Sequence, residues 1–222
     1  MFIVLEGLDG AGKSTQINYL QDFFWTRNQK SQFIHFPRFD APVYGPLIAQ
    51  FLRGDFGGMD QVSPKLVALL YAGDRYQAAP QIRSWLKEGY VVIADRYVYS
   101  NIAYQCAKVD DPAKQEELRE WIVQTEFVDF DLPKPDLNLF LDVPLSFVAQ
   151  QLCIPRKGED RAYLKGKSDI HESNLVFQEK VRQVYVSQAN MDSRFKIIPC
   201  GDDSGIMLPA AEIFARIKEK VT

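Results

Sequence analysis

The chain has 222 residues, 46% of them apolar, which is enough to bury one substantial core and is typical of a single domain over residues 1–222. Its 26 Lys and Arg against 29 Asp and Glu give a formal charge of -3, so no basic field predicts a nucleic-acid or membrane-surface partner. The cysteines, 3 in number and far apart, favour reduced thiols in a cytoplasmic protein over a disulfide framework.

The first residues, MFIVLEGLDG, are predicted to form a strand that turns into glycines. They lack the basic start and the longer apolar run of a signal peptide. No stretch of about 18 apolar residues occurs along the chain, so no membrane span is expected.

Five short apolar runs alternate with longer stretches of helical periodicity. The runs cover residues 2–6, 32–36, 90–95, 137–143 and 195–199. Because they are apolar nearly throughout, they favour a parallel sheet covered by helices on both faces, an α/β fold.

Helices are predicted between these strands. Ser63 and Pro64 form an N-cap and first-turn pair that starts a helix towards Trp85, and Pro80 is expected to break or kink it. Further helices are expected over 112–129, 171–191 and 208–221. No repeat, low-complexity tract or flexible linker indicates a second domain.

Residues 154–169 differ from the rest of the chain. The segment IPRKGEDRAYLKGKSD is rich in charge and poor in apolar residues. We expect a mobile charged lid, although the same composition also fits a solvated surface loop.

The strongest motif follows the first strand. Gly7-Leu8-Asp9-Gly10-Ala11-Gly12-Lys13-Ser14 satisfies the pattern G-x-x-x-x-G-K-[ST] of a P-loop. The glycines let backbone N–H groups face an anion, and the N-terminus of the next helix adds partial positive charge. Lys13 is expected to reach the β- and γ-phosphates of a nucleoside triphosphate, and the Ser14 hydroxyl to bind Mg²⁺.

This motif does not identify the reaction, because GTPases, motors, ATPases and small-molecule kinases share it. The chain lacks an Asn-Lys-x-Asp sequence for reading guanine and is short for a motor. A small kinase is therefore favoured.

A second candidate site follows the third strand, where Asp95, Arg96 and Tyr97 emerge at the carboxyl end. Open α/β sheets bind ligands at this edge. Asp95 is a candidate Mg²⁺ ligand, directly or through water, and Arg96 a candidate for neutralising phosphate oxygens. A structural ion pair is the alternative for both residues.

Extended along the chain, these motifs resemble the thymidylate (dTMP) kinase family. The matches are Gly7-Leu8-Asp9-x-Ala11-Gly12-Lys13-Ser14-Thr15, Phe36-Pro37-Arg38, Tyr71-x-x-x-Arg75, Asp95-Arg96-Tyr97-x-x-Ser100-x-x-Ala103-Tyr104-Gln105 and Pro135-Asp136-Leu137-x-Leu139-x-Leu141. The resemblance covers most of the chain, up to about residue 175. The resemblance implies a P-loop NTPase three-layer sandwich with a five-stranded parallel sheet, a mobile lid and a homodimeric state.

The resemblance also implies the substrates, dTMP and ATP, with Mg²⁺ as cofactor, and assigns residues to them. Residues Gly7, Leu8, Asp9, Gly10, Ala11, Gly12, Lys13, Ser14 and Thr15 would bind ATP. Asp9 would bind the deoxyribose 3′-hydroxyl, Arg38 and Arg96 the monophosphate, and Tyr104 would crowd the 2′ position, while Ser100 and Gln105 complete the acceptor site. Tyr71 would stack on thymine, unless it is an ordinary buried aromatic residue, and Arg75 would donate to a thymine carbonyl.

The chain departs from the family pattern at three points. Position 10 is Gly where some members carry an arginine that stabilises the transferring phosphoryl group, so Arg156 and Arg161 in the lid become the catalytic candidates, with Arg161 preferred. Arg38 follows Phe36-Pro37 directly, without the intervening residue of other members. The lid is also longer than usual.

Two rival functions remain open from the sequence. A deoxynucleoside kinase would need a carboxylate base for a sugar hydroxyl, and Glu6 is available for that role. A regulatory protein that binds ATP without an acceptor is the other rival. Of the histidines, His171 is expected at a helix start and His35 in the core.

Overall fold

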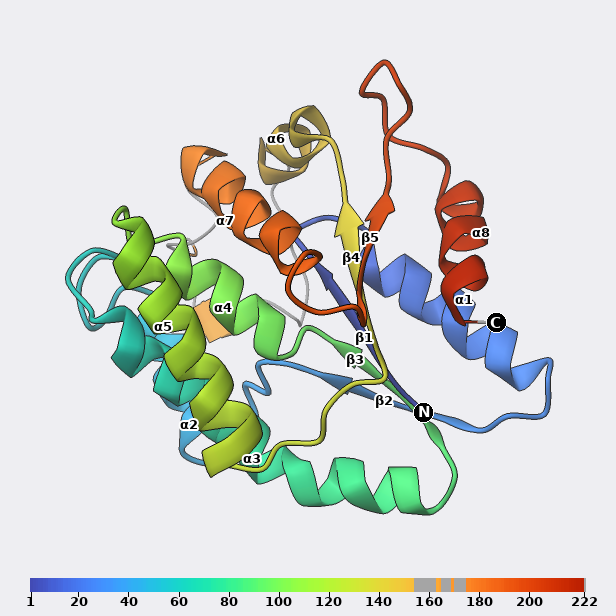
Figure 1. The fold of residues 1–222 in the computed structure, drawn as a ribbon, viewed down its shortest axis with the longest axis horizontal. Coiled ribbons are helices and arrows are strands. Elements are labelled where there is room, and N and C mark those ends of the chain that lie inside the picture. Colours follow the sequence, from blue (N-terminus) through green and yellow to red (C-terminus); the bar gives the residue numbers. More distant parts are fainter. Residues whose placement is uncertain (154–162, 165–168, 170–174, 222) are drawn as a thin grey trace.

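The computed structural model describes residues 1–153, 163–164, 169 and 175–221. Its centre is one sheet of five parallel strands in the order β2-β3-β1-β4-β5 (Figure 1). The strands are β1 Phe2–Gly7, β2 Ser31–His35, β3 Val91–Asp95, β4 Leu137–Asp142 and β5 Phe195–Pro199. The five predicted strands and their parallel arrangement are confirmed.

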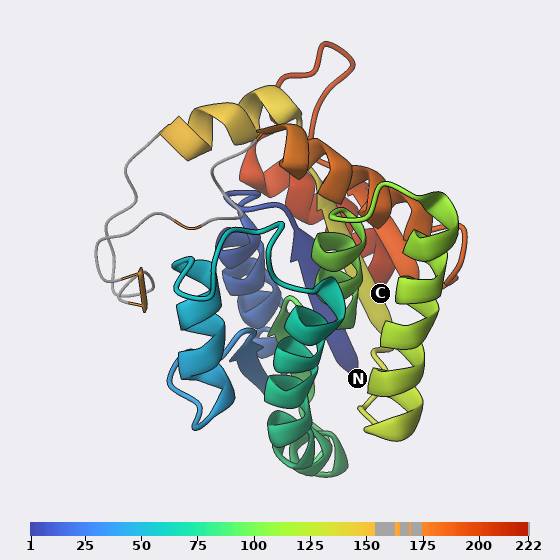
Figure 2. The same ribbon diagram turned by 90° about the vertical axis from the view of Figure 1, so that its left-hand side faces the viewer.

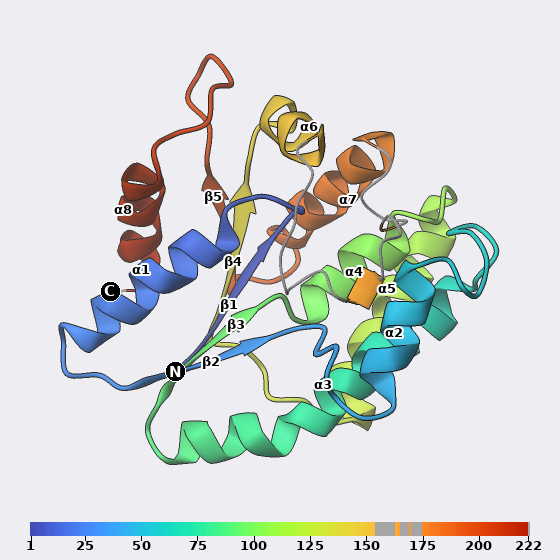
Figure 3. The ribbon, with the colours of Figure 1, turned by 180° about the vertical axis from the view of Figure 1, so that it is seen from behind.

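Helices cover both faces of this sheet, which makes three layers. They are α1 Lys13–Trp25, α2 Tyr44–Leu52, α3 Pro64–Lys87, α4 Val98–Cys106, α5 Pro112–Gln124, α6 Leu145–Cys153, α7 Leu175–Gln188 and α8 Ala210–Val221. A π-helical turn, η1 Thr125–Asp129, extends α5. Helices α1 and α8 lie on one face of the sheet, and α4 and α7 lie on the other (Figures 1 and 3).

The helix that contains Pro80 is continuous. α3 runs through this residue to Lys87, so of the two expected effects, a break or a kink, the break is wrong. The ring removes one backbone hydrogen bond, but the buried neighbours Ala78, Ala79 and Ile82 hold the helix in place on both sides of it.

Burial follows the position of each strand in the sheet. All residues of the central strand β1 are buried, whereas the edge strand β2 is only partly covered. His35 at the end of β2 is exposed, so its expected place in the core is wrong. The cause is the edge position, where only one neighbouring strand and fewer helices cover the side chains.

Cys106 and Cys200 are buried free thiols, as expected.

The strand register brings three chain segments to one edge of the sheet. Leu5 pairs with Asp95, and His35 pairs with Asp95 from the other side. The residues that follow β1, β2 and β3 therefore begin side by side, and the P-loop and the Asp95-Arg96 segment adjoin each other.

None of the described helices is long and apolar enough to cross a membrane.

A second, smaller core joins α2 and α3 beyond this edge. It contains Ile48, Phe51, Leu52 and Val67. Figure 2 shows α2, α3 and α5 side by side in front of the sheet. The close approach of α2 to α3 depends on Gly73, because a Cβ there would lie 2.2 Å from Tyr44 Cε1.

Replacing Gly73 with alanine is expected to destabilise the protein. A helical Gly→Ala change normally stabilises by about 1 kcal/mol. Here the added methyl group overlaps the Tyr44 ring, and overpacking of this kind costs about 1–3 kcal/mol. Urea unfolding of the wild type and Gly73→Ala measures the difference. In a Tyr44→Leu background the same change is expected to be neutral or stabilising, and a single variant as stable as wild type would contradict the packing argument.

Candidate active site

The loop after β1 has the backbone of a phosphate cradle. Gly10 and Gly12 both have a φ of 80°, in the left-handed region that favours glycine. Lys13 begins α1, and its Nζ donates a hydrogen bond to the Leu8 carbonyl at 3.2 Å. Ala11 is buried behind the loop, while Ser14 and Thr15 are exposed on the first turn of α1. The positive end of α1 and the Lys13 ammonium group therefore meet at one place.

Lys13 also faces Asp95 across the sheet edge. Its Nζ lies 3.9 Å from Asp95 Oδ1, and His35 Nδ1 lies 3.3 Å from Asp95 Oδ2. Burial by itself raises the pKa of Asp95, but Lys13 and His35 outweigh burial and hold that pKa below its ordinary value. Asp95 is therefore an ionised carboxylate at neutral pH.

The same carboxylate fits a magnesium site. Asp95 Oδ1 is buried and has no hydrogen-bond partner among the described residues. An unsatisfied buried oxygen is costly, and a hydrated cation would satisfy it. The Ser14 hydroxyl is exposed on the adjoining turn. No group of three or more His, Cys, Asp or Glu that could hold a metal occurs in the described part of the chain, so substrate oxygens and water would have to complete the coordination.

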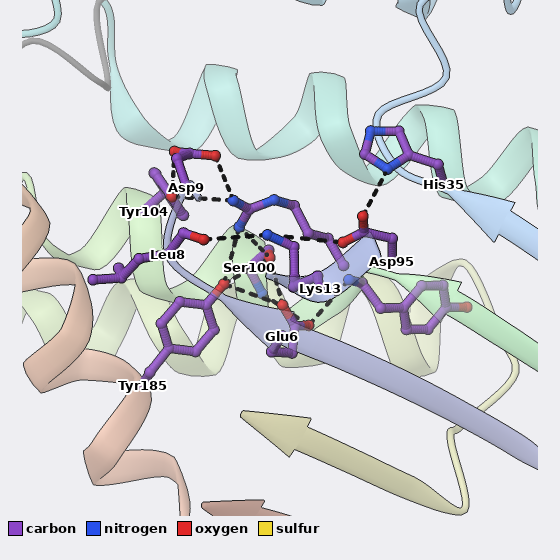
Figure 4. Close-up of polar contacts among 11 residues, drawn as sticks. Glu6, Leu8, Asp9, Lys13, His35, Asp95, Ser100, Tyr104 and Tyr185 are labelled. Atoms are coloured by element: carbon purple, nitrogen blue, oxygen red, sulfur yellow. Dashed lines mark hydrogen bonds and ion pairs between the residues drawn. The ribbon is translucent and has the colours of Figure 1, made fainter. Parts of the chain in front are cut away.

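Arg96 is the centre of the second candidate site. This residue has a φ of 65°, an uncommon backbone conformation for a residue other than glycine, which turns its side chain towards the P-loop. Its Nη2 donates to Asp9 Oδ1 at 2.7 Å, and the Tyr104 hydroxyl donates to Asp9 Oδ2 at 2.8 Å. Asp9 thus joins the end of β1 to α4 (Figure 4). Although burial by itself lowers the pKa of Arg96, Tyr104 and Asp9 raise it well above its ordinary value.

A buried carboxylate supports Arg96 from below. Glu6 accepts hydrogen bonds from the backbone N–H of Tyr97 at 3.0 Å and of Ser100 at 3.2 Å. Its second oxygen accepts from the Ser100 hydroxyl and, at 3.1 Å, from the Tyr185 hydroxyl. Burial raises the pKa of Glu6 above its ordinary value, although the hydrogen bond of Ser100 and the charge of Arg96 lower it. Figure 4 shows Glu6, Ser100 and Tyr185 together beneath the guanidinium group.

Ser100 and Tyr185 complete the support of Arg96. Both hydroxyls accept hydrogen bonds from its Nη1, at 3.2 Å and 3.4 Å. Ser100 was expected to contact substrate, and the structure places its hydroxyl within this internal network. Tyr185, on α7, was missed from the sequence. Its only signal there was an aromatic residue on a helical face, which is typical of core packing.

Arg38 lies at the start of the loop after β2 and is held by α3. Its Nε donates to Asp74 Oδ1 at 2.9 Å, and its Nη2 donates to the Asp74 carbonyl at 2.8 Å. Its backbone N–H donates to Asp74 Oδ2 at 2.9 Å. Asp74, which the sequence did not single out, therefore fixes the direction of the Arg38 side chain.

Arg75, expected to read a base, is fully buried and paired with Glu126 of η1. Its Nε and Nη2 donate to the two carboxylate oxygens at 2.5 Å and 2.7 Å. Asn101 of α4 joins the pair, because its Nδ2 donates to Glu126 Oε1 at 2.8 Å and to the Ala68 carbonyl at 3.0 Å. Asn101 and Glu126 were both missed from the sequence, where nothing indicated that η1 approaches α3 and α4.

Tyr71 lies one helical turn before Arg75 on α3. It is half-buried beside the second core, whose flank also includes Phe39 and Tyr163. Burial raises the pKa of Tyr71, and the charges of Asp169, Arg96, Asp9 and Arg75 all reach it. Tyr71 therefore lies near Asp9 and Arg96 as well as near Arg75.

Two described residues of the segment 154–169 contact this region. The Tyr163 ring stacks on Phe39 with 3.8 Å between ring centroids, and its hydroxyl donates to Asp169 at 2.9 Å. Arg53 Nη1 donates to the Tyr163 carbonyl at 2.6 Å. Arg156, Arg161 and His171 lie outside the described residues, as does most of the predicted lid.

Gln105 and Lys108 form a polar pair at the end of α4. Gln105 is buried, and its Oε1 accepts a hydrogen bond from Lys108 Nζ at 2.9 Å. Burial lowers the pKa of Lys108 to about 7, against the opposing charges of Asp169 and Asp60. Lys108 Nζ also lies 4.7 Å from the centre of the Phe51 ring. The pair therefore adjoins the second core.

Comparison with known proteins identifies what this arrangement resembles. The family model for thymidylate kinase matches residues 5–204. A probable thymidylate kinase of Thermococcus kodakarensis is 34% identical over 91% of this chain and 91% of its own length. The thymidylate kinase of Mycobacterium tuberculosis is 31% identical over 85% of this chain and 86% of its own length. A solved thymidylate kinase structure from Candida albicans superposes with a TM-score of 0.72 at 28% identity, covering 99% of this chain and 90% of the other.

The shifted pKa of Lys108 predicts a pH-dependent stability. The unfolded chain holds this proton up to its ordinary pKa of 10.5, but the folded protein releases it at about 7. The contribution of Lys108 to the free energy of unfolding therefore rises between these pH values and is lowest below pH 7.

Lys108→Met is expected to be more stable than wild type by at least about 1 kcal/mol at pH 6. This difference should narrow as the pH rises towards 10. Urea unfolding at a series of pH values measures it, with the exposed Lys114→Met as the matched control. A constant difference between Lys108→Met and wild type across the range would show that Lys108 does not titrate near neutral pH.

Proposed function

The chain belongs to the thymidylate kinase family and phosphorylates dTMP, and we propose that ATP is the phosphoryl donor and that transfer takes place between the P-loop and Arg96. The observation that carries this proposal is the position of Arg96. Its guanidinium group is held on Asp9 of the P-loop itself, at 2.7 Å, so a site for an acceptor phosphate adjoins the cradle for the donor phosphates.

On the donor side, the backbone of Gly7 to Thr15 would surround the phosphates of ATP. The left-handed glycines and the N-terminus of α1 supply N–H groups and partial positive charge. The Lys13 ammonium group would exchange its contact with the Leu8 carbonyl for the β- and γ-phosphates.

Ser14 and Asp95 are the residues that would hold Mg²⁺. The unsatisfied Asp95 Oδ1 and the exposed Ser14 hydroxyl support this assignment. When bound, the ion would neutralise charge on the phosphate oxygens of the donor.

On the acceptor side, Arg96 would bind the dTMP phosphate. Asp9 would accept a hydrogen bond from the sugar 3′-hydroxyl, and Tyr104, fixed to Asp9, would stand against a 2′-hydroxyl. Arg38, held by Asp74, is the second candidate for the phosphate, and Gln105 completes the sugar side. Ser100 would act through Arg96, whose direction it helps to set.

The base would lie against the side of α3 that carries Tyr71 and Arg75. A half-buried aromatic ring favours stacking on any base, so selection among bases needs polar contacts. Asn101 Oδ1 is buried with no partner among the described residues and can accept a hydrogen bond from a ring N–H. Arg75 supplies a guanidinium donor for a carbonyl oxygen. One donor and one acceptor match the O4 and N3–H groups of thymine.

The transfer itself needs little chemistry from the protein. The acceptor phosphate is already an anionic nucleophile, so no general base is required, and catalysis consists of positioning and charge neutralisation. Lys13 and Arg96 supply positive charge on the two sides of the transferred group. Arg156 and Arg161 remain the candidates for the charge that the P-loop lacks at Gly10.

The deoxynucleoside kinase alternative is disfavoured by the state of Glu6. Its two carboxylate oxygens accept four hydrogen bonds from Tyr97, Ser100 and Tyr185, and the residue has 0% exposure. A base for a sugar hydroxyl must reach that hydroxyl, and Glu6 is occupied beneath Arg96. A regulatory protein that binds ATP without an acceptor would have no need for the linked side chains of Arg96, Asp9 and Tyr104 beside the P-loop.

We expect the functional form to be a homodimer that pairs through α3. The exposed face of α3 and the adjoining η1 carries large apolar side chains at Leu66, Leu69, Tyr76 and Val128. Several large apolar side chains exposed on neighbouring elements are typical of a protein interface. Helix α3 lies in front of the sheet in the view of Figure 2.

Removal of either central cation is expected to abolish turnover, and circular dichroism separates this loss of activity from any loss of fold. Lys13→Ala and Arg96→Ala should each lower dTMP-dependent ADP release by at least about 100-fold. Each substitution removes a positive charge that would stabilise the transferred phosphoryl group. A coupled ADP assay with Mg²⁺, run on a panel of nucleoside monophosphates and on thymidine, measures this. Arg83→Ala, on the exposed far end of α3, is the matched control.

Near-normal turnover in Lys13→Ala or Arg96→Ala would contradict the assigned roles. Activity on thymidine in place of dTMP would instead contradict the choice of acceptor.

The dimer has its own test. Leu69→Asp should convert the protein to a monomer, because it places a charge in the centre of the apolar face. Ile206→Asp, which is also exposed but lies in the loop after β5, should leave the association state unchanged. Sedimentation equilibrium of the three proteins measures the molar mass. A monomeric wild type would exclude the proposed interface.

A further inference from the structure

The π-helical turn η1 places a carboxylate in the interior. α5 ends at Gln124, and the wider turn Thr125–Asp129 follows it, closed by a hydrogen bond from Phe130 N to the Thr125 carbonyl at 2.9 Å. A π turn rotates the residues that follow it relative to an α-helix, and such turns are frequent at functional sites. Here Glu126, with 0% exposure, points to α3 and α4.

Glu126 fixes two side chains that belong to different helices. It receives Nε and Nη2 of Arg75 in a two-pronged pair, and the same carboxylate accepts from Asn101 Nδ2. Burial by itself would lower the pKa of Arg75, but Glu126 outweighs burial and raises it, so Arg75 stays charged. The carboxylate therefore determines the position of both groups at once.

The contacts also determine which atom of Asn101 is available. Its amide nitrogen faces two acceptors, Glu126 Oε1 and the Ala68 carbonyl, and neither can pair with the amide oxygen. The amide is therefore locked, with Oδ1 left over as a buried acceptor that has no partner among the described residues. Arg75 makes its described contacts through Nε and Nη2, which leaves the donors of Nη1 for a ligand.

We infer that Glu126 is the residue that sets the hydrogen-bonding polarity of the base site and thereby selects a pyrimidine with a carbonyl group and a ring N–H over cytosine. This inference rests on the proposed function, in which the base lies against Arg75 and Asn101. Thymine and uracil offer an acceptor at O4 and a donor at N3. Cytosine offers a donor at N4 and an acceptor at N3, so both contacts would be reversed.

A carboxylate is required for this role because it is an acceptor at both oxygens. A glutamine in its place presents one donor and one acceptor. A glutamine nitrogen at the position of Oε1 would face Asn101 Nδ2 and Arg75 Nη2, which are both donors, so each of these groups would lose an acceptor that sets its direction. The change is of equal size, so it alters polarity with little change of shape.

The experiment compares kcat/KM for dTMP, dUMP and dCMP in the wild type, Glu126→Gln and Glu126→Asp. A site that hydrogen-bonds its substrate rejects a mismatched analogue strongly, so the wild type should prefer dTMP and dUMP to dCMP by about 1,000-fold or more. Glu126→Gln should reduce this preference at least about tenfold, mainly by raising KM for dTMP, with kcat less affected. Glu117→Gln, an exposed member of an ion pair on α5, is the matched control and should retain the wild-type preference.

Every result of this experiment either supports or overturns the role of Glu126 in base selection. A folded Glu126→Gln, verified by circular dichroism, with an unchanged dTMP:dCMP preference would overturn the inference. If Glu126→Gln does not fold, Glu126→Asp decides, because it keeps the charge for Arg75 but is too short to hold both partners. An unchanged preference and KM in Glu126→Asp would then overturn it. A wild type without activity on dTMP would instead refute the proposed function.

Discussion

The structure depends on a buried cation at the carboxyl edge of the sheet. The Arg96 side chain is only 12% exposed, and its charge is tolerated because Asp9 receives it on one side and the Glu6, Ser100 and Tyr185 network supports it on the other. These partners come from β1, α4, α7 and the P-loop. The same interaction therefore holds four parts of the chain together and leaves a positive charge beside the phosphate cradle.

This constraint explains the division of labour among the acidic residues. Glu6 is shielded, fully hydrogen-bonded and has a raised pKa, whereas Asp95 keeps an unsatisfied oxygen and has a lowered pKa because of Lys13 and His35. Two carboxylates near each other on adjacent strands thus have different tasks. One supports the acceptor arginine, and the other is suited to a metal ion on the donor side.

The sequence was sufficient for the sheet and the P-loop, because apolar runs and glycine spacing are local signals. Lys13, Asp95, Arg96 and Tyr104 were singled out because they follow strand ends or form a recognisable pattern, and the structure brings them together at one edge of the sheet. The sequence failed for His35, since a strand pattern does not reveal an edge position. Glu126 and Asn101 were missed because their role depends on a π turn that brings distant helices together, and a turn of that kind has no simple periodicity. Tyr185 looked like an ordinary core residue because an aromatic side chain on a helical face is typical of core packing.

Helix α4 has a further consequence for how such an enzyme can diverge. Ser100, Asn101 and Tyr104 lie within one and a half turns of it and contact, in order, Arg96, Glu126 and Asp9, the residues that we assign to the acceptor phosphate, the base and the sugar. A shift of α4 by a single residue would therefore disturb the contacts at all three regions of the nucleotide at once. New acceptor preferences should arise by substitutions on the flanking α3 and η1, while the sequence and position of α4 are retained.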